Sequence, residues 1–154
     1  MITVEEYLTY CDKALDGYAA IARQLGDDLV NERPADVPGA NTASGLIAHA
    51  AGVISRWGST VNLGIVVPRD RDAEFAAIGT VDDALALLDA ARARLHADAR
   101  AASPRHPPVN PPPPADHPGF DATQGDVLLH VYEELAQHLG QLEVTRDVLL
   151  ARRA

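Results

Sequence analysis

The sequence is poor in cysteine, in aromatic residues and in positive charge, and each shortage excludes a class of protein. A single cysteine, Cys11, in 154 residues excludes an internal disulfide framework and is typical of a reducing compartment. Aromatic residues make up only 5% while alanine is abundant, which favours closely packed helices over a β-sandwich. Lys and Arg number 13 against 22 Asp and Glu, and the resulting net charge of −9 argues against a nucleic-acid-binding surface.

Long apolar runs are also missing. No stretch approaches the roughly 18 consecutive apolar residues that a membrane-spanning helix needs. The opening residues, MITVEEYLTYC, are acidic and amphipathic, and they lack the basic segment and apolar run of a signal peptide. We therefore expect a cytoplasmic protein, formed as one domain over residues 1–154, that binds neither membranes nor nucleic acids.

What the sequence does contain is four segments whose apolar residues recur every three to four positions, the period of an amphipathic helix. Thr3 and Glu6 predict a capping box before the first helix, and Gly26 is a stop signal near its end. Thr80 and Thr123 are similar start signals, and residues 69–79 are predicted to be a charged connection. The four helices are expected at about residues 4–26, 43–67, 81–100 and 126–150.

A proline-dense segment, SPRHPPVNPPPPADHP, begins at Ser103 and separates the last two predicted helices. Such a segment cannot be helical, and we expect it to be extended and on the surface. The whole connection, about 103–122, is long for a compact domain, so it is either a long crossover or a lid over a site. Four amphipathic helices with this connection before the last predict an all-α fold, a four-helix bundle.

The apolar face of the last predicted helix also carries His130, Glu134 and His138, spaced four apart. A helix turns about 100° per residue, so these side chains project within an arc of roughly 80°. His49 lies on the inward stripe of the second predicted helix, among small residues. Facing helices of a bundle bring such groups together, and two imidazoles with a carboxylate leave a coordination position open on a divalent metal. Because His130 and His138 are about 12 Å apart along the axis, His49 would share an ion either with His130 and Glu134 or with Glu134 and His138.

Each of these residues also has an ordinary structural interpretation. A lone His49 on an apolar face is more often a hydrogen-bonded core histidine, and Glu134 with His138 can form an i, i+4 ion pair. Cys11 lies on an apolar stripe and is predicted to be a core residue rather than a reactive thiol. The metal interpretation gains from the coincidence of three ligand-type residues on two inward faces.

Three segments together resemble the DinB/YfiT-like superfamily: NERPADVPGANTASGLIAHAAGVISRW, the run RDRDAEF, and LLHVYEELAQHLGQLEVTRDVL. They are most similar to the actinobacterial branch that is grouped with mycothiol-dependent maleylpyruvate isomerases and other bacterial thiol transferases. The resemblance implies a DinB-like four-helix bundle with one divalent metal, held by the residues at the matching positions, His49, Glu134 and His138. It further implies that His130 lines the pocket or supports the ligands, and that Gln141 orients a bound water or ligand.

The activity implied by the resemblance is a metal-dependent S-transfer, in which mycothiol attacks an electrophilic small molecule as its thiolate. A divalent ion with these ligands lowers the pKa of a bound thiol or water. Zinc is the first choice of metal, and nickel, iron and manganese accept the same ligands. Two alternatives stay open: a non-catalytic, stress-associated metal-binding bundle and a metal-dependent hydrolase. The resemblance also implies a homodimer.

Two further residues of the second predicted helix adjoin the expected pocket. Arg56, like Arg69 and Arg71, could bind anionic groups of the thiol or the electrophile, although a solvated surface arginine is the more ordinary interpretation. Trp57 is expected beside the pocket as a core anchor rather than as a stacking platform.

Overall fold

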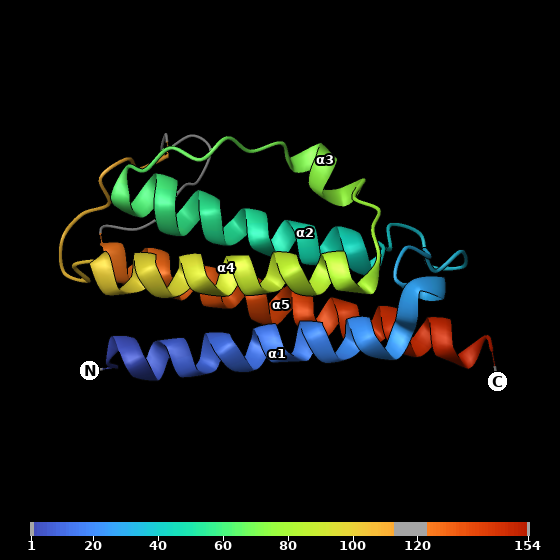
Figure 1. The fold of residues 1–154 in the computed structure, drawn as a ribbon. Coiled ribbons are helices and arrows are strands. Elements are labelled where there is room, and N and C mark those ends of the chain that lie inside the picture. Colours follow the sequence, from blue (N-terminus) through green and yellow to red (C-terminus); the bar gives the residue numbers. More distant parts are fainter. Residues whose placement is uncertain (1, 113–122, 154) are drawn as a thin grey trace.

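The computed structural model describes residues 2–112 and 123–153, and within them the chain is helical and without strands (Figure 1). Four long helical segments pack lengthwise as a bundle, and the short helix α3 (Arg71–Phe75) lies in the connection between the second and third. This confirms the predicted all-α bundle. None of the described helices is both long and apolar enough to cross a membrane. The long segments are α1 (Val4–Leu29), α2 (Ala43–Val53) continued by the π-helix η1 (Ile54–Asn62), α4 (Val81–Ala101) and α5 (Gln124–Ala151).

Threonines begin all four long segments. The hydroxyl oxygens of Thr3, Thr42, Thr80 and Thr123 each accept a hydrogen bond from the backbone N–H three residues later. Such a bond satisfies one of the amides that the first turn of a helix leaves unpaired. At Thr3, Thr80 and Thr123 the backbone N–H of the threonine also donates to the acidic side chain three residues later, which completes a capping box. The predicted helix starts are therefore confirmed.

The ends of two predicted segments differ from the sequence-based expectation. Helix α1 bends at Gly26, whose φ of 64° favours glycine, and then continues to Leu29. The second segment was expected to reach Pro68 but ends at Asn62. The Thr60 hydroxyl donates to the Ile65 carbonyl and accepts from the Val67 amide, so the chain folds back on η1 instead of continuing.

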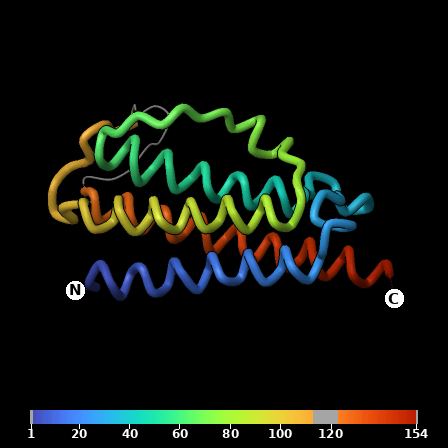
Figure 2. The backbone as a smooth tube through the Cα atoms, in the orientation of Figure 1, coloured from blue at the N-terminus to red at the C-terminus, as the bar shows by residue number. Residues whose placement is uncertain are grey.

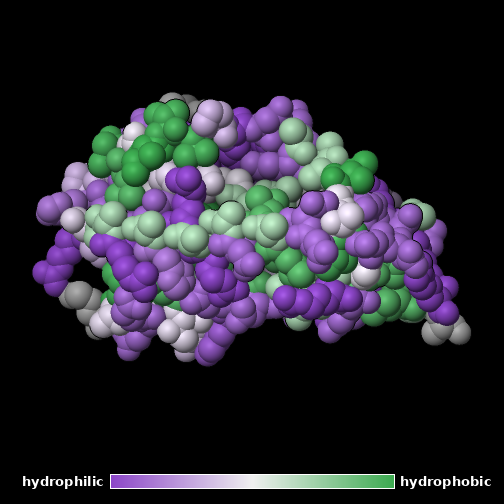
Figure 3. All heavy atoms as spheres, in the orientation of Figure 1, coloured by the Kyte–Doolittle hydropathy of each residue, from purple (hydrophilic) through white to green (hydrophobic). Residues whose placement is uncertain are grey.

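The connection after η1 is not only a loop, as the sequence had suggested. Asp70 accepts a hydrogen bond from the amide of Ala73 and so begins α3, which packs against α2. The same connection leaves Ile65 and Val66 exposed. Figure 3 shows hydrophobic side chains gathered at that end of the molecule, on a face that is otherwise largely hydrophilic.

The core lies between the four long segments. Helix α1 packs against α4 and α5, and the α2–η1 segment also packs against α4 and α5. Figure 2 shows that α2 and η1 run antiparallel to α5. Tyr18 of α1 is fully buried, and its hydroxyl donates to the backbone carbonyl of Leu135 in α5. The centre of α5 is therefore held by a buried polar contact as well as by apolar packing.

The described part of the proline-dense segment closes one end of the bundle. The amides of Val109 and Asn110 donate to the carbonyls of Asn62 and Val61, and the amide of Gly125 donates to the carbonyl of Pro104. These bonds tie the segment to the end of η1 and the start of α5, away from His49 in the middle of α2. Residues 113–122, on which the expectation of a lid also rests, lie outside the described residues.

Candidate metal centre

His49 on α2 faces Glu134 and His138 on α5. The Nε2 atom of His138 is 3.3 Å from Oε2 of Glu134, and the Nε2 atom of His49 is 3.9 Å from the same oxygen. One ligand-type atom from each residue lies within 4.8 Å of the others. Zinc-bound nitrogen and oxygen atoms lie about 2.0–2.2 Å from the ion, so small side-chain movements would let all three reach one centre. Two imidazoles and a carboxylate are also a suitable donor set for a divalent metal.

His130 is close to Glu134 but belongs to a different part of the helix interface. Its Nε2 atom is 3.9 Å from the other carboxylate oxygen of Glu134, Oε1. The His130 ring packs edge-on against Trp57, with ring centroids 4.7 Å apart, whereas His49 packs edge-on against His138 at 4.6 Å. Of the two groupings that spacing left open, the structure thus brings His49 together with Glu134 and His138.

The three residues differ in their access to solvent. The side chain of His49 is only 3% exposed, whereas those of Glu134 and His138 are 27% and 21% exposed. A small molecule could therefore approach from the α5 side. The neighbouring imidazoles of His138 and then of His49 hold the pKa of Glu134 well below its usual range, against the effect of burial. In return, the carboxylate of Glu134 raises the pKa of His138.

A second carboxylate lies behind His49. Oε2 of Glu74, at the end of α3, is 2.8 Å from the Nδ1 atom of His49. Arg69 holds the same carboxylate through two contacts, from Nε to Oε1 at 2.6 Å and from Nη2 to Oε2 at 2.9 Å. Burial is the largest influence on Glu74 and opposes its ionisation, but the bonds from Arg69 and His49 together lower its pKa. Phe75 covers the face of His49, with ring centroids 4.4 Å apart and planes inclined by 25°.

The sequence does not predict Glu74 as a site residue. Glu74 belongs to the run RDRDAEF, which contributed to the family resemblance, but residues 69–79 were interpreted as a charged connection. Arg69 was considered as an anion-binding residue, and the structure instead engages it with Glu74.

The remaining predicted residues lie around this cluster. The side-chain oxygen of Gln141 is 3.2 Å from Nδ1 of His138 and can accept its hydrogen bond. Trp57 is 6% exposed and belongs to the core, as expected. The guanidinium of Arg56 lies 5.9 Å from the centre of the Trp57 ring, and that of Arg71 lies 5.1 Å from the centre of the Phe75 ring. Arg56 therefore lies over the ring that packs against His130. Arg71 lies over the ring that stacks on His49.

Comparison with known proteins adds a family to this geometry. The model of the mycothiol-S-transferase family matches residues 5–150. The chain belongs to this family. The predicted resemblance to bacterial thiol transferases of the DinB/YfiT-like superfamily is thereby confirmed. No curated protein matches the chain.

One solved structure shares the fold of this mycothiol-S-transferase family member. It is the crystal structure of a conserved protein of a locus from Enterococcus faecalis, with a TM-score of 0.75 over 98% of this chain and 99% of that chain. The two sequences are only 14% identical, so this likeness shows the fold alone.

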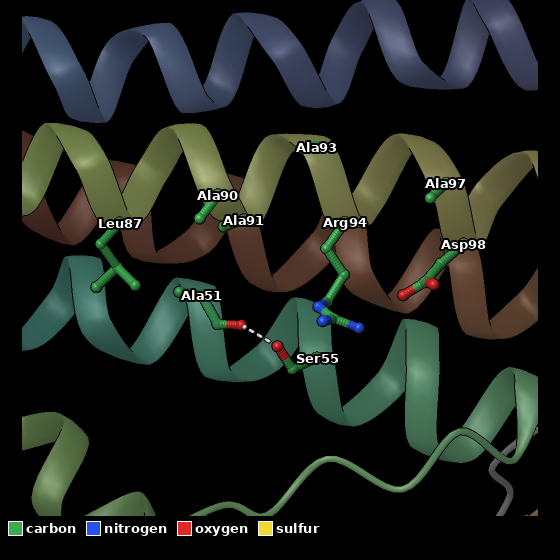
Figure 4. Close-up of a pocket in the computed structure, with 9 residues that line it drawn as sticks. All are labelled: Ala51, Ser55, Leu87, Ala90, Ala91, Ala93, Arg94, Ala97 and Asp98. Atoms are coloured by element: carbon green, nitrogen blue, oxygen red, sulfur yellow. Dashed lines mark hydrogen bonds between the residues drawn. The ribbon is translucent and has the colours of Figure 1, made fainter.

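A groove of about 410 Å³ lies on the other side of α2 of this chain, between the α2–η1 segment and α4 (Figure 4). Alanines and Leu87 form most of its lining, and the hydroxyl of Ser55 at its edge donates to the carbonyl of Ala51. Asp98, also in the lining, is buried and accepts a hydrogen bond from Ser59. The residues that line the groove do not include His49, Glu134 or His138. The metal-type cluster is thus a separate feature, set between α2 and α5.

Proposed function

We propose that this protein is a metal-dependent S-transferase that joins mycothiol, a low-molecular-weight thiol, to an electrophilic small molecule. The observation that carries the proposal is the convergence of His49, Glu134 and His138 within 4.8 Å of one another in a member of the mycothiol-S-transferase family. In the reaction the thiol gives up its proton and its sulfur forms a bond to an electrophilic carbon. Either a leaving group departs from that carbon with the electron pair of the broken bond, or a double bond of the electrophile breaks and the adduct takes up the proton.

The residues divide the work between holding the ion and shaping the space beside it. Nε2 of His49, Nε2 of His138 and the carboxylate of Glu134 would hold one divalent ion, with zinc as the first choice and nickel, iron or manganese as alternatives. When bound, the ion lowers the pKa of a thiol at its open position. Gln141 orients His138 through Nδ1, and His130, Trp57 and Arg56 border the cluster toward η1.

Three further expectations belong to the same proposal. Residues 1–154 would act as one domain, in the cytoplasm, and as a homodimer. Light scattering of the purified protein, with and without zinc, tests the dimer directly. A monomeric mass under both conditions would remove the dimer from the proposal and leave the metal site untouched.

The first experiment is a metal analysis. Protein stripped with a chelator and reloaded with zinc should contain about one ion per chain, and His49→Ala should lose most of that binding, because a single remaining imidazole and one carboxylate bind zinc weakly. His96→Ala is the matched control, because His96 pairs with Asp12 between α4 and α1, outside the cluster. If the wild-type protein retains no divalent ion, or if both variants bind alike, the proposed site is wrong.

The second experiment follows turnover. The zinc-loaded protein should conjugate mycothiol to a fluorogenic electrophile such as monochlorobimane, and His138→Ala should abolish the thiol-dependent rate while His96→Ala retains it. Metal binding without thiol-dependent turnover on several electrophiles would replace the transferase with a non-catalytic metal-binding bundle.

A further inference from the structure

The two ring nitrogens of His49 face different groups. Nδ1 lies 2.8 Å from the carboxylate of Glu74, and Nε2 points to the cluster, 3.9 Å from Glu134. A neutral imidazole carries one N–H and one lone pair, and only the nitrogen with the lone pair can bind a metal. The group that pairs with Nδ1 therefore decides whether Nε2 is available.

Glu74 is the stronger of the two partners of Nδ1. Nη2 of Arg69 is also within 3.3 Å of this nitrogen, and a guanidinium can only donate, whereas an ionised carboxylate can only accept. Arg69 already donates to both oxygens of Glu74, in the two-pronged arrangement that suits guanidinium and carboxylate. Because the contact to Glu74 is shorter and Arg69 is engaged with that carboxylate, Nδ1 donates to Glu74. The lone pair then lies on Nε2.

The surroundings of Glu74 leave it little freedom. A side-chain carbon added to Gly52, one turn after His49, would overlap Oε1 of Glu74 and displace its carboxylate. Phe75, the next residue of α3, stacks on the His49 ring and limits its rotation. Glu74 is only 11% exposed. The short helix α3 thus places a carboxylate and an aromatic ring on His49, in a slot that a glycine of α2 keeps open.

We propose that Glu74 is a positioning residue for the metal centre, which fixes the proton of His49 on Nδ1 and presents Nε2 to an ion shared with Glu134 and His138. The inference rests on the proposed function in so far as it concerns a metal. Carboxylates that hold ligand histidines in this way are typically worth about 10–100-fold in metal affinity or activity.

The affinity test compares Glu74→Ala and Glu74→Gln with Asp72→Asn, a matched control on the same short helix that does not contact His49. Zinc affinity is measured by competition with a chelator. We expect Glu74→Ala to weaken binding by about 10–100-fold, Glu74→Gln to recover part of the loss because its amide oxygen can still accept from Nδ1, and Asp72→Asn to stay within about twofold of the wild type.

The second readout is the position of the proton itself. In the metal-free protein, ¹⁵N NMR distinguishes an imidazole protonated on Nδ1 from one protonated on Nε2, and His49→Ala identifies the resonances. We expect the Nδ1–H form of His49 in the wild type, and a shift toward the Nε2–H form in Glu74→Ala. A residue that only stabilised α3 would leave this equilibrium unchanged.

Gly52→Ala provides a variant that retains the carboxylate but displaces it. We expect it to weaken zinc binding in the same direction as Glu74→Ala, and it serves if the latter fails to fold. Wild-type affinity in both variants, or an Nε2–H tautomer of His49 in the wild type, overturns the inference and leaves the proposed function intact. If the wild type binds no metal, the proposed function fails, whereas the tautomer measurement still decides the role of Glu74.

Discussion

Glu134 lies between His130 and His138 on α5 and faces both histidines. Its Oε2 atom faces His138 and His49, and its Oε1 atom faces His130. The nearby imidazoles of His138 and then of His49 keep its pKa low, so it is a carboxylate, and not a carboxylic acid, at neutral pH. Burial raises the pKa of Tyr18 in the core, and the negative charge of Glu134 raises it further. A neutral residue at position 134 would therefore change the charge seen by several groups.

At the scale of single residues we also predict that Cys11 takes no part in thiol chemistry. The residue is fully buried on α1, and burial raises the pKa of its thiol to about 11. Since the thiolate is the reactive form, Cys11 should resist alkylation in the folded protein and react fully after denaturation, as measured by mass spectrometry. Cys11→Ala should retain mycothiol-dependent turnover. Rapid alkylation of the native protein, or loss of turnover in a folded Cys11→Ala variant, would contradict this prediction.

The sequence could predict some site residues and not others, for physical reasons. A spacing of four residues placed His130, Glu134 and His138 on one helix face, but the choice between the two histidines depends on how α2 and α5 align along their axes. That alignment is set by packing between distant segments, which periodicity does not encode. Glu74 was out of reach for the same reason, because its role depends on a contact with a histidine 25 positions earlier.

At the scale of elements, the π-helix η1 matters for the alignment of rings. His49 and Trp57 are eight residues apart, and so are their ring partners His138 and His130 on α5. The i→i+5 bonds of a π-helix turn the chain less per residue than an α-helix does. This geometry returns Trp57 toward the face that carries His49, and both rings meet α5. The apolar periodicity indicates α-helical turns throughout, so it predicts that the segment is helical but not where it widens or ends.

Helix α4 yields a prediction of pH dependence. Asp83 accepts hydrogen bonds from the backbone amide and then from the hydroxyl of Thr80, and these bonds lower its pKa below the ordinary value of 3.8. A carboxyl whose pKa is lower in the folded state stabilises that state above the unfolded pKa, and the stabilisation is lost as the pH falls through the folded pKa. Asp83→Asn should therefore unfold at a lower urea concentration than the wild type at neutral pH. The difference should shrink once the pH is below about 3.8.

Asp82→Asn is the control for this measurement. Asp82 lies in the same turn of α4, and Thr80 bonds to Asp83 and not to Asp82. We expect a smaller loss of stability in this variant at neutral pH. Equal losses in the two variants would attribute the effect to charge near the helix start rather than to the capping box.

At the scale of the whole molecule, the cluster bridges segments that are far apart in the sequence. His49 comes from α2, whereas Glu134 and His138 come from α5. The unfolded chain does not hold these residues together, so an ion that binds all three stabilises the folded state by mass action. The net charge of −9 also favours the approach of a cation.

We predict that free zinc at about 100 times its Kd raises the free energy of unfolding by about 2.7 kcal/mol, measured by urea denaturation with and without metal. A chelator should reverse the increase, because it removes the ion and leaves the fold intact. His138→Ala should show no comparable increase. Equal stabilisation of this variant would mean that zinc acts at another place on the molecule.

The contact between α3 and His49 also has a consequence for the order in which the centre assembles. Glu74, Arg69 and Phe75 are closer to His49 in the sequence than Glu134 and His138 are, so their contacts close shorter loops and cost somewhat less chain entropy. Glu134 and His138 follow on α5, after α4 and the proline-dense segment. During synthesis, which proceeds from the N-terminus, the environment of His49 can form before α5 has emerged from the ribosome. Metal uptake would then be the last step of folding, when α5 docks on α2 and the ring of His49 is already oriented by α3.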